Sequence, residues 1–116
     1  SSLAGLIGMP GAPGYSASKA AVRAYGEALR GLYRGQGIGV SVVIPGFIKS
    51  GITDKNKLPM PFLMPADKAA RIIARGLSRN KARIAFPWKM YSLILLISAL
   101  PMGLIDRIFS RLPDKK

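Results

Sequence analysis

The sequence contains no histidine and no cysteine, and only five of its 116 residues are acidic. A Ser-His-Asp triad, a cysteine nucleophile, a disulfide, a zinc finger and a CxxC redox pair each need imidazole or thiolate, so the sequence excludes all of them. The carboxylates are scattered singly, at Glu27, Asp54, Asp67, Asp106 and Asp114. This scatter argues against a metal site or a paired-carboxylate glycosidase built from this chain alone. Catalysis would have to use Ser, Thr, Tyr, Lys or an isolated carboxylate.

Positive charge dominates, because 18 Lys and Arg residues give a net charge of +13. A hydrophobic content of 49% with 20% charged residues is typical of a globular domain with one modest core. The basic residues follow no nucleic-acid-binding motif, so we expect no nucleic-acid partner. Arg71, Arg75 and Arg79 recur every four residues, which favours a solvated cationic face over a phosphate site.

The first fourteen residues hold four glycines and two prolines, which indicates a loop. The alanine-rich pattern from Tyr15 to about Tyr33 predicts a helix, which Gly35, Gly37 and Gly39 would end. Small residues lie on more than one face of this helix, so we expect it to form a symmetric contact in a homodimer or tetramer. The chain begins on an apolar stretch without a basic segment before it, so we expect no secretory signal and a cytoplasmic location. We interpret it as a piece of a longer protein.

Strand signals follow the helix. Residues 40–44 are a β-branched run before Pro45-Gly46, which predicts a buried strand and the turn that leaves it. Residues 46–65 predict a long loop, 66–79 a second helix and 82–87 a short strand. A helix that leads into such a strand is half of a parallel βαβ unit, so the pattern predicts an α/β domain over residues 1–87.

The last segment, residues 88–116, differs in character. Sixteen uncharged residues separate Lys89 from Asp106, and Pro101 interrupts them. A bilayer-spanning helix needs about 20 apolar residues, so we expect a broken helical hairpin from Trp88 to Ile105 instead. Three placements stay open: a membrane surface, whose anionic lipids would attract the basic flanks, the mouth of the active site, or a partner subunit. In the membrane case the substrate would be apolar.

The candidate chemistry lies at the start of the first predicted helix. Tyr15 and Lys19 are four residues apart, which places a phenol and an ammonium on one helix face. A tyrosine is ordinarily protonated at neutral pH, and a neighbouring cation favours its ionised form, so the pair suits proton exchange. The same spacing occurs by chance in many helices as a plain surface pair. Ser2, thirteen residues before Tyr15, makes the pattern more specific.

Three segments, Ser2–Gly5, Tyr15–Ala21 and Pro45–Ser50, together closely resemble the short-chain dehydrogenase/reductase family. The resemblance runs from Ser2 to about Phe86. It implies the C-terminal half of a doubly wound Rossmann-type parallel sheet, with residues 88–116 as a helical C-terminal extension. It also implies an NAD(P)-dependent oxidoreductase that transfers a hydride between nicotinamide and a carbonyl or alcohol substrate. The alternatives are a non-enzymatic basic membrane-surface module and an inactive fragment.

The resemblance further implies three catalytic residues. Tyr15 would be the general acid/base for the substrate oxygen. Lys19 would favour the ionised form of Tyr15 and would hydrogen-bond the nicotinamide ribose. Ser2 would hydrogen-bond the substrate oxygen, and Ser1 is the alternative serine, although the thirteen-residue spacing favours Ser2.

The cofactor would lie along the turn after the predicted strand. Besides Tyr15 and Lys19, the resemblance implies contacts from Pro45, Gly46, Ile48 and Ser50, with Ile48 offering backbone groups to the carboxamide. Ser50 stands where the family usually has threonine, and Thr53 is the alternative hydroxyl. The family's glycine-rich dinucleotide loop is not in this sequence, so the choice between NAD and NADP stays open and we expect this chain alone to be inactive.

Overall fold

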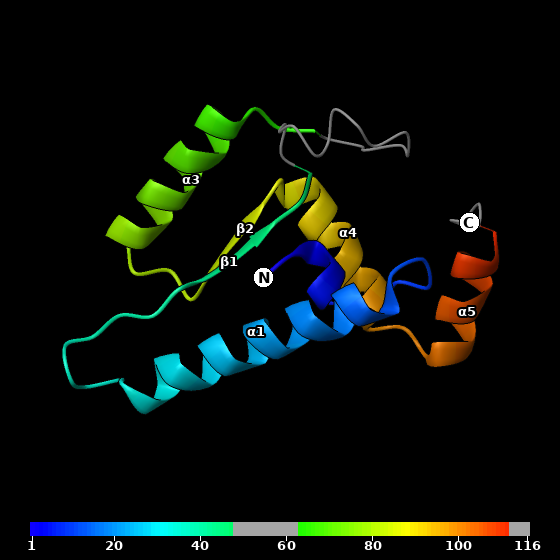
Figure 1. Cartoon of the computed structure of the whole chain (residues 1–116), viewed down its shortest axis with the longest axis horizontal. Helices are drawn as coiled ribbons and strands as arrows, with labels where there is room; N and C mark the ends of the chain where they lie inside the picture. The colour runs from blue at the N-terminus through cyan, green and yellow to red at the C-terminus, as the bar shows by residue number, and fades with distance from the viewer. Residues whose placement is uncertain (48–62, 112–116) are drawn as a thin grey trace.

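The computed structural model describes residues 1–47 and 63–111. Helices and strands alternate along it (Figure 1). The elements are the 3-10 helix η1 (Leu3–Gly5), α1 (Pro13–Leu32), β1 (Val42–Pro45), α3 (Ala66–Ser78), β2 (Arg83–Phe86), α4 (Trp88–Ser98) and α5 (Met102–Ser110). This order confirms the predicted α/β class.

The two described strands pair in parallel, with Val42 opposite Arg83 and Pro45 opposite Phe86. Parallel neighbours need a crossover connection, and here α3 lies between them in the chain. The Gly46 amide donates to the Phe86 carbonyl oxygen at 2.8 Å, which continues the pairing one residue past β1. β1, α3 and β2 therefore form a parallel βαβ unit, whereas the sequence indicated such a unit only from the first helix and the strand that follows it.

Helices cover both faces of this sheet (Figure 1). Successive strand residues point to opposite faces, so each face has its own cluster of buried side chains. The cluster on the α3 side contains Met64, Ala69, Ile84 and Phe86. The cluster on the other side contains Leu3, Val42 and Ile44, with Met90 and Tyr91 of α4 packed against it. Burial on both faces is the arrangement of a doubly wound sheet.

The boundaries of the elements differ slightly from the predicted ones. The first helix begins at Pro13, two residues before Tyr15, because the fixed φ of proline suits the first turn of a helix. It ends at Leu32, and Gly35 and Gly37 then adopt φ values of 89° and 74°, which glycine tolerates best. The predicted loop at the start of the chain contains η1, and β1 includes Pro45.

The C-terminal segment is broken as predicted. Pro101 precedes α5 as its N-cap residue, and α5 continues beyond Ile105 to Ser110. α4 contacts β2, yet none of its residues is fully buried. Within residues 1–47 and 63–111, no helix combines the length and the apolar character needed to cross a bilayer.

Candidate active site

Three pieces of the chain meet at the carboxyl edge of the sheet: η1, the first half of α1 and the end of β1. Ser2 caps η1, because its side-chain oxygen accepts a hydrogen bond from the Ala4 amide at 3.2 Å. The next residue, Leu3, packs on the strand end, where a Cβ added to Gly46 would lie 3.2 Å from Leu3 Cδ1. In open parallel sheets, ligands bind outside the carboxyl ends of the strands.

The predicted proton-exchange pair is adjacent in the structure. The Lys19 ammonium nitrogen lies 5.4 Å from the centroid of the Tyr15 ring, which is a cation–π distance. The Tyr15 side chain is 51% exposed. Lys19 is half-buried, because the start of the chain covers one side of it. The phenol is therefore held beside a cation and stays accessible to a ligand.

The two adjacent serines have different hydrogen-bond partners. The Ser1 hydroxyl donates to the Lys19 carbonyl oxygen at 2.8 Å, which ties the start of the chain to α1. The Ser2 hydroxyl accepts from Ala4, and within the described residues it donates to no acceptor. Ser2 consequently has a proton to offer a ligand, whereas the proton of Ser1 is already used.

Gly5 lets η1 approach α1 closely. A Cβ at this position would lie 2.8 Å from the Lys19 carbonyl carbon and 2.8 Å from the Ser1 hydroxyl oxygen. Real Cβ atoms essentially never come so close, so any side chain here would push the two segments apart. The absence of a side chain at Gly5 thus permits the Ser1–Lys19 hydrogen bond.

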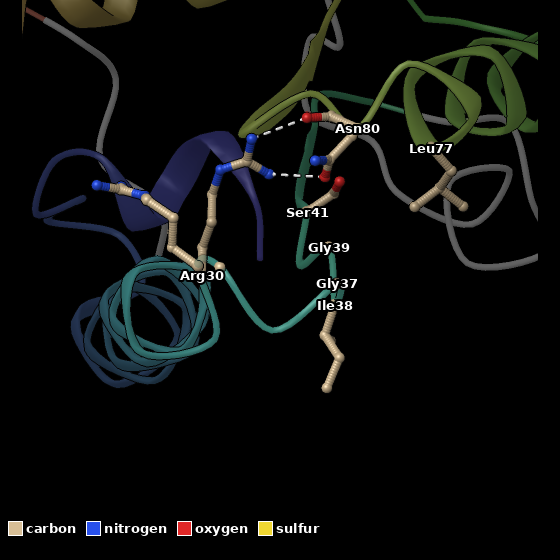
Figure 2. Close-up of a pocket in the computed structure, with 9 residues that line it drawn as sticks. Arg30, Gly37, Ile38, Gly39, Ser41, Leu77 and Asn80 are labelled. Atoms are coloured by element: carbon tan, nitrogen blue, oxygen red, sulfur yellow. Dashed lines mark hydrogen bonds between the residues drawn. The ribbon is translucent and has the colours of Figure 1, made fainter.

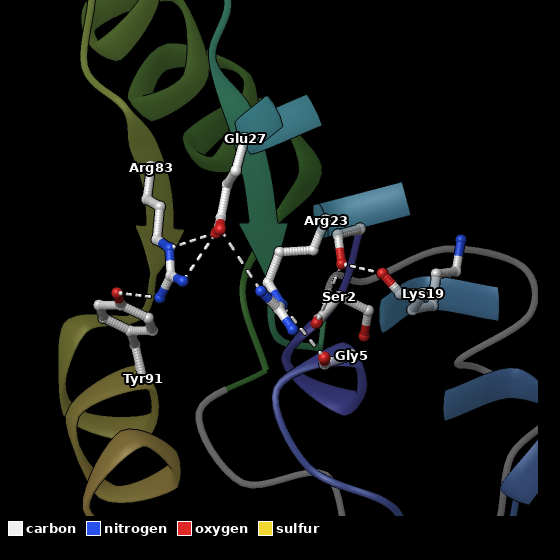
Figure 3. Close-up of polar contacts among 8 residues, drawn as sticks. Ser2, Gly5, Lys19, Arg23, Glu27, Arg83 and Tyr91 are labelled. Carbon is white, nitrogen blue, oxygen red and sulfur yellow. Dashed lines mark hydrogen bonds and ion pairs between the residues drawn. The ribbon is translucent and has the colours of Figure 1, made fainter. Parts of the chain in front are cut away.

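An ion-pair network holds the middle of α1 against β2 and α4 (Figure 3). The Arg83 guanidinium contacts Glu27 Oε1 through Nη2 at 2.7 Å and through Nε at 2.8 Å. Arg83 also donates to the Tyr91 hydroxyl at 3.2 Å. Glu27 Oε2 lies 3.4 Å from Arg23, which in turn donates to the Gly5 carbonyl oxygen at 3.3 Å. The network links α1 to the strand, to the C-terminal segment and to η1.

Arg83 keeps its positive charge over the ordinary pH range, because its pKa is raised from a value that is already high. The hydrogen bond to Tyr91 raises the pKa of Arg83 above its usual value, burial opposes that rise, and pairing with Glu27 adds to it. A raised pKa in the folded state contributes stability that is lost only as pH rises through that value. The guanidinium therefore stays charged wherever the protein is folded.

One cavity, of about 560 Å³, lies away from these residues, at the amino edge of the sheet (Figure 2). Arg30 lines this cavity. Its guanidinium donates to the Val40 carbonyl at 2.8 Å, to Asn80 Oδ1 at 3.1 Å and to the Asn80 carbonyl at 2.8 Å. These bonds join the segments that lead into β1 and β2. They use both terminal nitrogens of the Arg30 guanidinium, which are therefore already paired. We therefore interpret this cavity as a structural feature.

A second cavity, of about 470 Å³, lies between η1, the loop that follows it and the first half of α1. Its apolar wall includes Leu6, Ile7 and Met9. Neither cavity is lined by Ser2, Tyr15 or Lys19.

Part of the predicted cofactor turn is described. Pro45 ends β1, and the Gly46 amide is occupied by the Phe86 carbonyl. Ile48, Ser50 and Thr53 lie outside the described residues. In the described ranges, no group of three acidic side chains could hold a metal ion.

The sequence did not indicate the supporting contacts. Arg23 and Glu27 are four residues apart, and this spacing could have revealed their pairing. Arg83 lies 56 residues from Glu27, and no local pattern connects the two. The close approach at Gly5 is likewise a tertiary contact, which the Gly-rich composition of the loop does not distinguish from an ordinary turn.

Comparison with known proteins agrees with this fold. The profile of the family described as short chain dehydrogenase matches residues 1–60, about half of the chain. An uncharacterized oxidoreductase of Myxococcus xanthus is 41% identical over 112 residues, which are 97% of this chain and 44% of the relative. An uncharacterized oxidoreductase of Mycobacterium tuberculosis is 38% identical over 109 residues, 92% of this chain and 43% of the relative. Epidermal retinol dehydrogenase 2 of Mus musculus is 33% identical over 108 residues, which are 88% of this chain and 35% of the relative.

A parallel βαβ unit with helices on both faces is part of a doubly wound sheet, and the matched segment includes Ser2, Tyr15, Lys19, Pro45 and Gly46. The chain belongs to the short-chain dehydrogenase family. It spans less than half the length of the curated relatives described above.

Proposed function

We propose that this chain is the catalytic, C-terminal half of an NAD(P)-dependent oxidoreductase that transfers a hydride between nicotinamide and a carbonyl or alcohol. Family membership supports the reaction class. The observation that carries the proposal is the Lys19 ammonium 5.4 Å from the ring centroid of an exposed Tyr15, on the part of α1 that packs against η1. A lysine in contact with an accessible tyrosine suits proton transfer at a bound ligand.

In this proposal, Tyr15 exchanges the proton and Ser2 positions the substrate oxygen. During oxidation, the Tyr15 phenolate accepts the proton of the substrate hydroxyl, and the Lys19 ammonium stabilises the phenolate electrostatically. During reduction, Tyr15 returns that proton to the carbonyl oxygen. Ser2 donates a hydrogen bond to the same oxygen, in accord with its available proton. A nicotinamide cofactor held by Tyr15 and Lys19 would supply or receive the hydride.

The described residues fit the nicotinamide end of such a cofactor. Lys19 offers N–H donors and Tyr15 an O–H group for ribose hydroxyls, and Gly46 presents no side chain at the strand end. Pro45, Ile48 and Ser50 complete the proposed set. No G-x-G-x-x-G segment for the pyrophosphate occurs in the sequence, so the proposal assigns only the nicotinamide end to this chain and leaves open NAD or NADP.

We further propose an apolar carbonyl or alcohol as the substrate class. One mouse relative is named as a retinol dehydrogenase. The cavity beside the first half of α1 also has an apolar wall, formed in part by Leu6, Ile7 and Met9.

Replacement of Lys19 tests the assignment in the full-length protein that contains this chain. We expect Lys19→Ala to lower turnover by about 100-fold or more, because the tyrosine loses its charged neighbour. Nucleotide affinity should fall as well, because the lysine is proposed to contact the ribose. The matched control is Lys68→Ala on an exposed position of α3, which should change neither quantity. Steady-state kinetics and fluorescence titration with NAD and NADP measure both, and a Lys19→Ala variant with unchanged turnover and affinity would refute the proposal.

A further inference from the structure

Helix α4 has two distinct faces. Its half-buried positions are Met90, Tyr91, Ile94, Leu95, Ile97 and Ser98. Its exposed positions follow the helical period on the other side, and we call four of them the outer face of α4: Trp88, Lys89, Leu93 and Leu96. Trp88 is 70% exposed and Leu96 is 66% exposed. An amphipathic helix on a protein surface normally points its polar side to water, whereas here the outer face is mostly apolar.

Exposed apolar side chains also occur after the break at Pro101. Met102 and Leu104 of α5 are also exposed, so five large apolar side chains between residues 88 and 104 face solvent. Figure 1 shows α4 and α5 as consecutive helices at the C-terminal end of the fold. A concentration of exposed apolar side chains of this kind marks an interaction site.

Positive charge accompanies this apolar surface. The Lys89 ammonium lies 5.8 Å from the Trp88 ring centroid, so cation and aromatic ring lie together at the start of α4. Arg107 and Arg111 are exposed towards the end of α5. Asp106 is the one acidic residue among described positions 88–111. Aromatic and apolar side chains with neighbouring cations are the composition of helices that lie in a membrane interface.

The lengths of the helices favour a position on the membrane surface. α4 has 11 residues and α5 has 9. A helix that crosses the hydrocarbon core needs about 20. Pro101 between the two helices prevents them from joining into one longer helix.

We propose that the outer face of α4, together with the exposed Met102 and Leu104 of α5, docks on an anionic lipid surface. The net charge of +13 complements such a surface, and the apolar side chains would enter the headgroup boundary while Lys89 contacts lipid phosphates. This inference goes beyond the proposed oxidoreductase activity and does not depend on it, because docking uses neither Tyr15 nor Lys19.

The test is co-sedimentation of the full-length protein with phosphatidylcholine vesicles that contain phosphatidylserine, compared with pure phosphatidylcholine vesicles. We expect binding to the anionic vesicles that weakens as salt screens the charges. Leu96→Glu should reduce partitioning at least about tenfold. It removes apolar area that would otherwise enter the lipid, and it adds a negative charge that the anionic lipids repel. Lys89→Gln should reduce it about fivefold, the contribution of one cation near the surface.

A matched control separates this face from a general loss of apolar surface. Leu77→Glu changes an exposed leucine on α3, on the other side of the sheet, and should leave partitioning unchanged. Equal partitioning of Leu96→Glu and the unmodified protein would overturn the proposal, as would equal binding to neutral and anionic vesicles. Absence of binding to the anionic vesicles would also overturn the proposal, because the face would then not be available to lipid in the full-length protein. A smaller oligomer for Leu96→Glu without lipid would assign the face to a second copy of the chain, which also overturns the proposal.

Discussion

The Ser1 hydroxyl donates a hydrogen bond to the Lys19 carbonyl oxygen at 2.8 Å. Lys19 also places its ammonium 5.4 Å from the Tyr15 ring centroid. The backbone of Lys19 is therefore fixed to the start of the chain, while its side chain reaches Tyr15, the proposed acid/base. This relationship separates Ser1 from Ser2, whose hydroxyl accepts from the Ala4 amide and has no acceptor within residues 1–47 and 63–111.

Alanine substitution should distinguish the two serines in the full-length protein. Ser1→Ala loses a partly buried hydrogen bond and should lower the free energy of unfolding by about 1 kcal/mol, with turnover reduced only a few-fold. Ser2→Ala loses a cap of similar strength, but it should reduce turnover at least about tenfold because the substrate oxygen loses a donor. Urea denaturation and steady-state kinetics measure the two effects. A greater loss of turnover in Ser1→Ala than in Ser2→Ala would reverse their roles.

Gly5→Ala should destabilise the protein by about 1–3 kcal/mol, because the added methyl group pushes the backbone of η1 away from the backbone of α1. The structural reason is the 2.8 Å separation between a Cβ at Gly5 and the Lys19 carbonyl carbon. Gly8→Ala is the control, since a Cβ there meets nothing within 4 Å. Urea denaturation of both variants measures the difference. Equal midpoints for Gly5→Ala and Gly8→Ala would show that η1 does not pack tightly on α1.

The exposed side of α1 predicts a symmetric subunit contact. Val22, Tyr25 and Leu32 are 52%, 69% and 65% exposed, and Ala28 is exposed among them. Ala28→Arg should shift the sedimentation profile of the full-length protein towards the monomer, because a charge would enter an apolar contact. Ala74→Arg, at an exposed alanine of α3, should leave the profile unchanged. An Ala28→Arg variant with the unmodified profile would place the contact elsewhere.

Local sequence signals predicted the elements well. The alanine pattern predicted α1, the apolar spacing after Pro65 predicted α3, and Pro101 predicted the break between α4 and α5. The contact between Tyr15 and Lys19 was also predictable, because it depends only on spacing within one helix. The start of α1 was predicted two residues late, since the helix-starting preference of Pro13 was not considered.

Tertiary contacts were not predictable in the same way. Glu27 meets Arg83 across 56 residues, and their pairing follows from the packing of α1 beside β2 rather than from any pattern along the chain. The use of Ser1 as a tether likewise depends on Gly5, which allows η1 to approach α1. Single-sequence spacing therefore located the proposed acid/base pair, whereas the contacts that orient it required the structure.

Turnover by the Tyr15→Phe variant of the full-length protein is the most direct test of the proposed chemistry. Removal of the hydroxyl should lower turnover by about 100- to 10,000-fold, because the substrate oxygen loses its proton partner, while nucleotide affinity stays within a few-fold. Tyr25→Phe, at a 69% exposed tyrosine of the same helix, provides the control and should retain full turnover. A Tyr15→Phe enzyme with turnover within a few-fold of the unmodified protein would contradict the assignment of Tyr15 as the general acid/base.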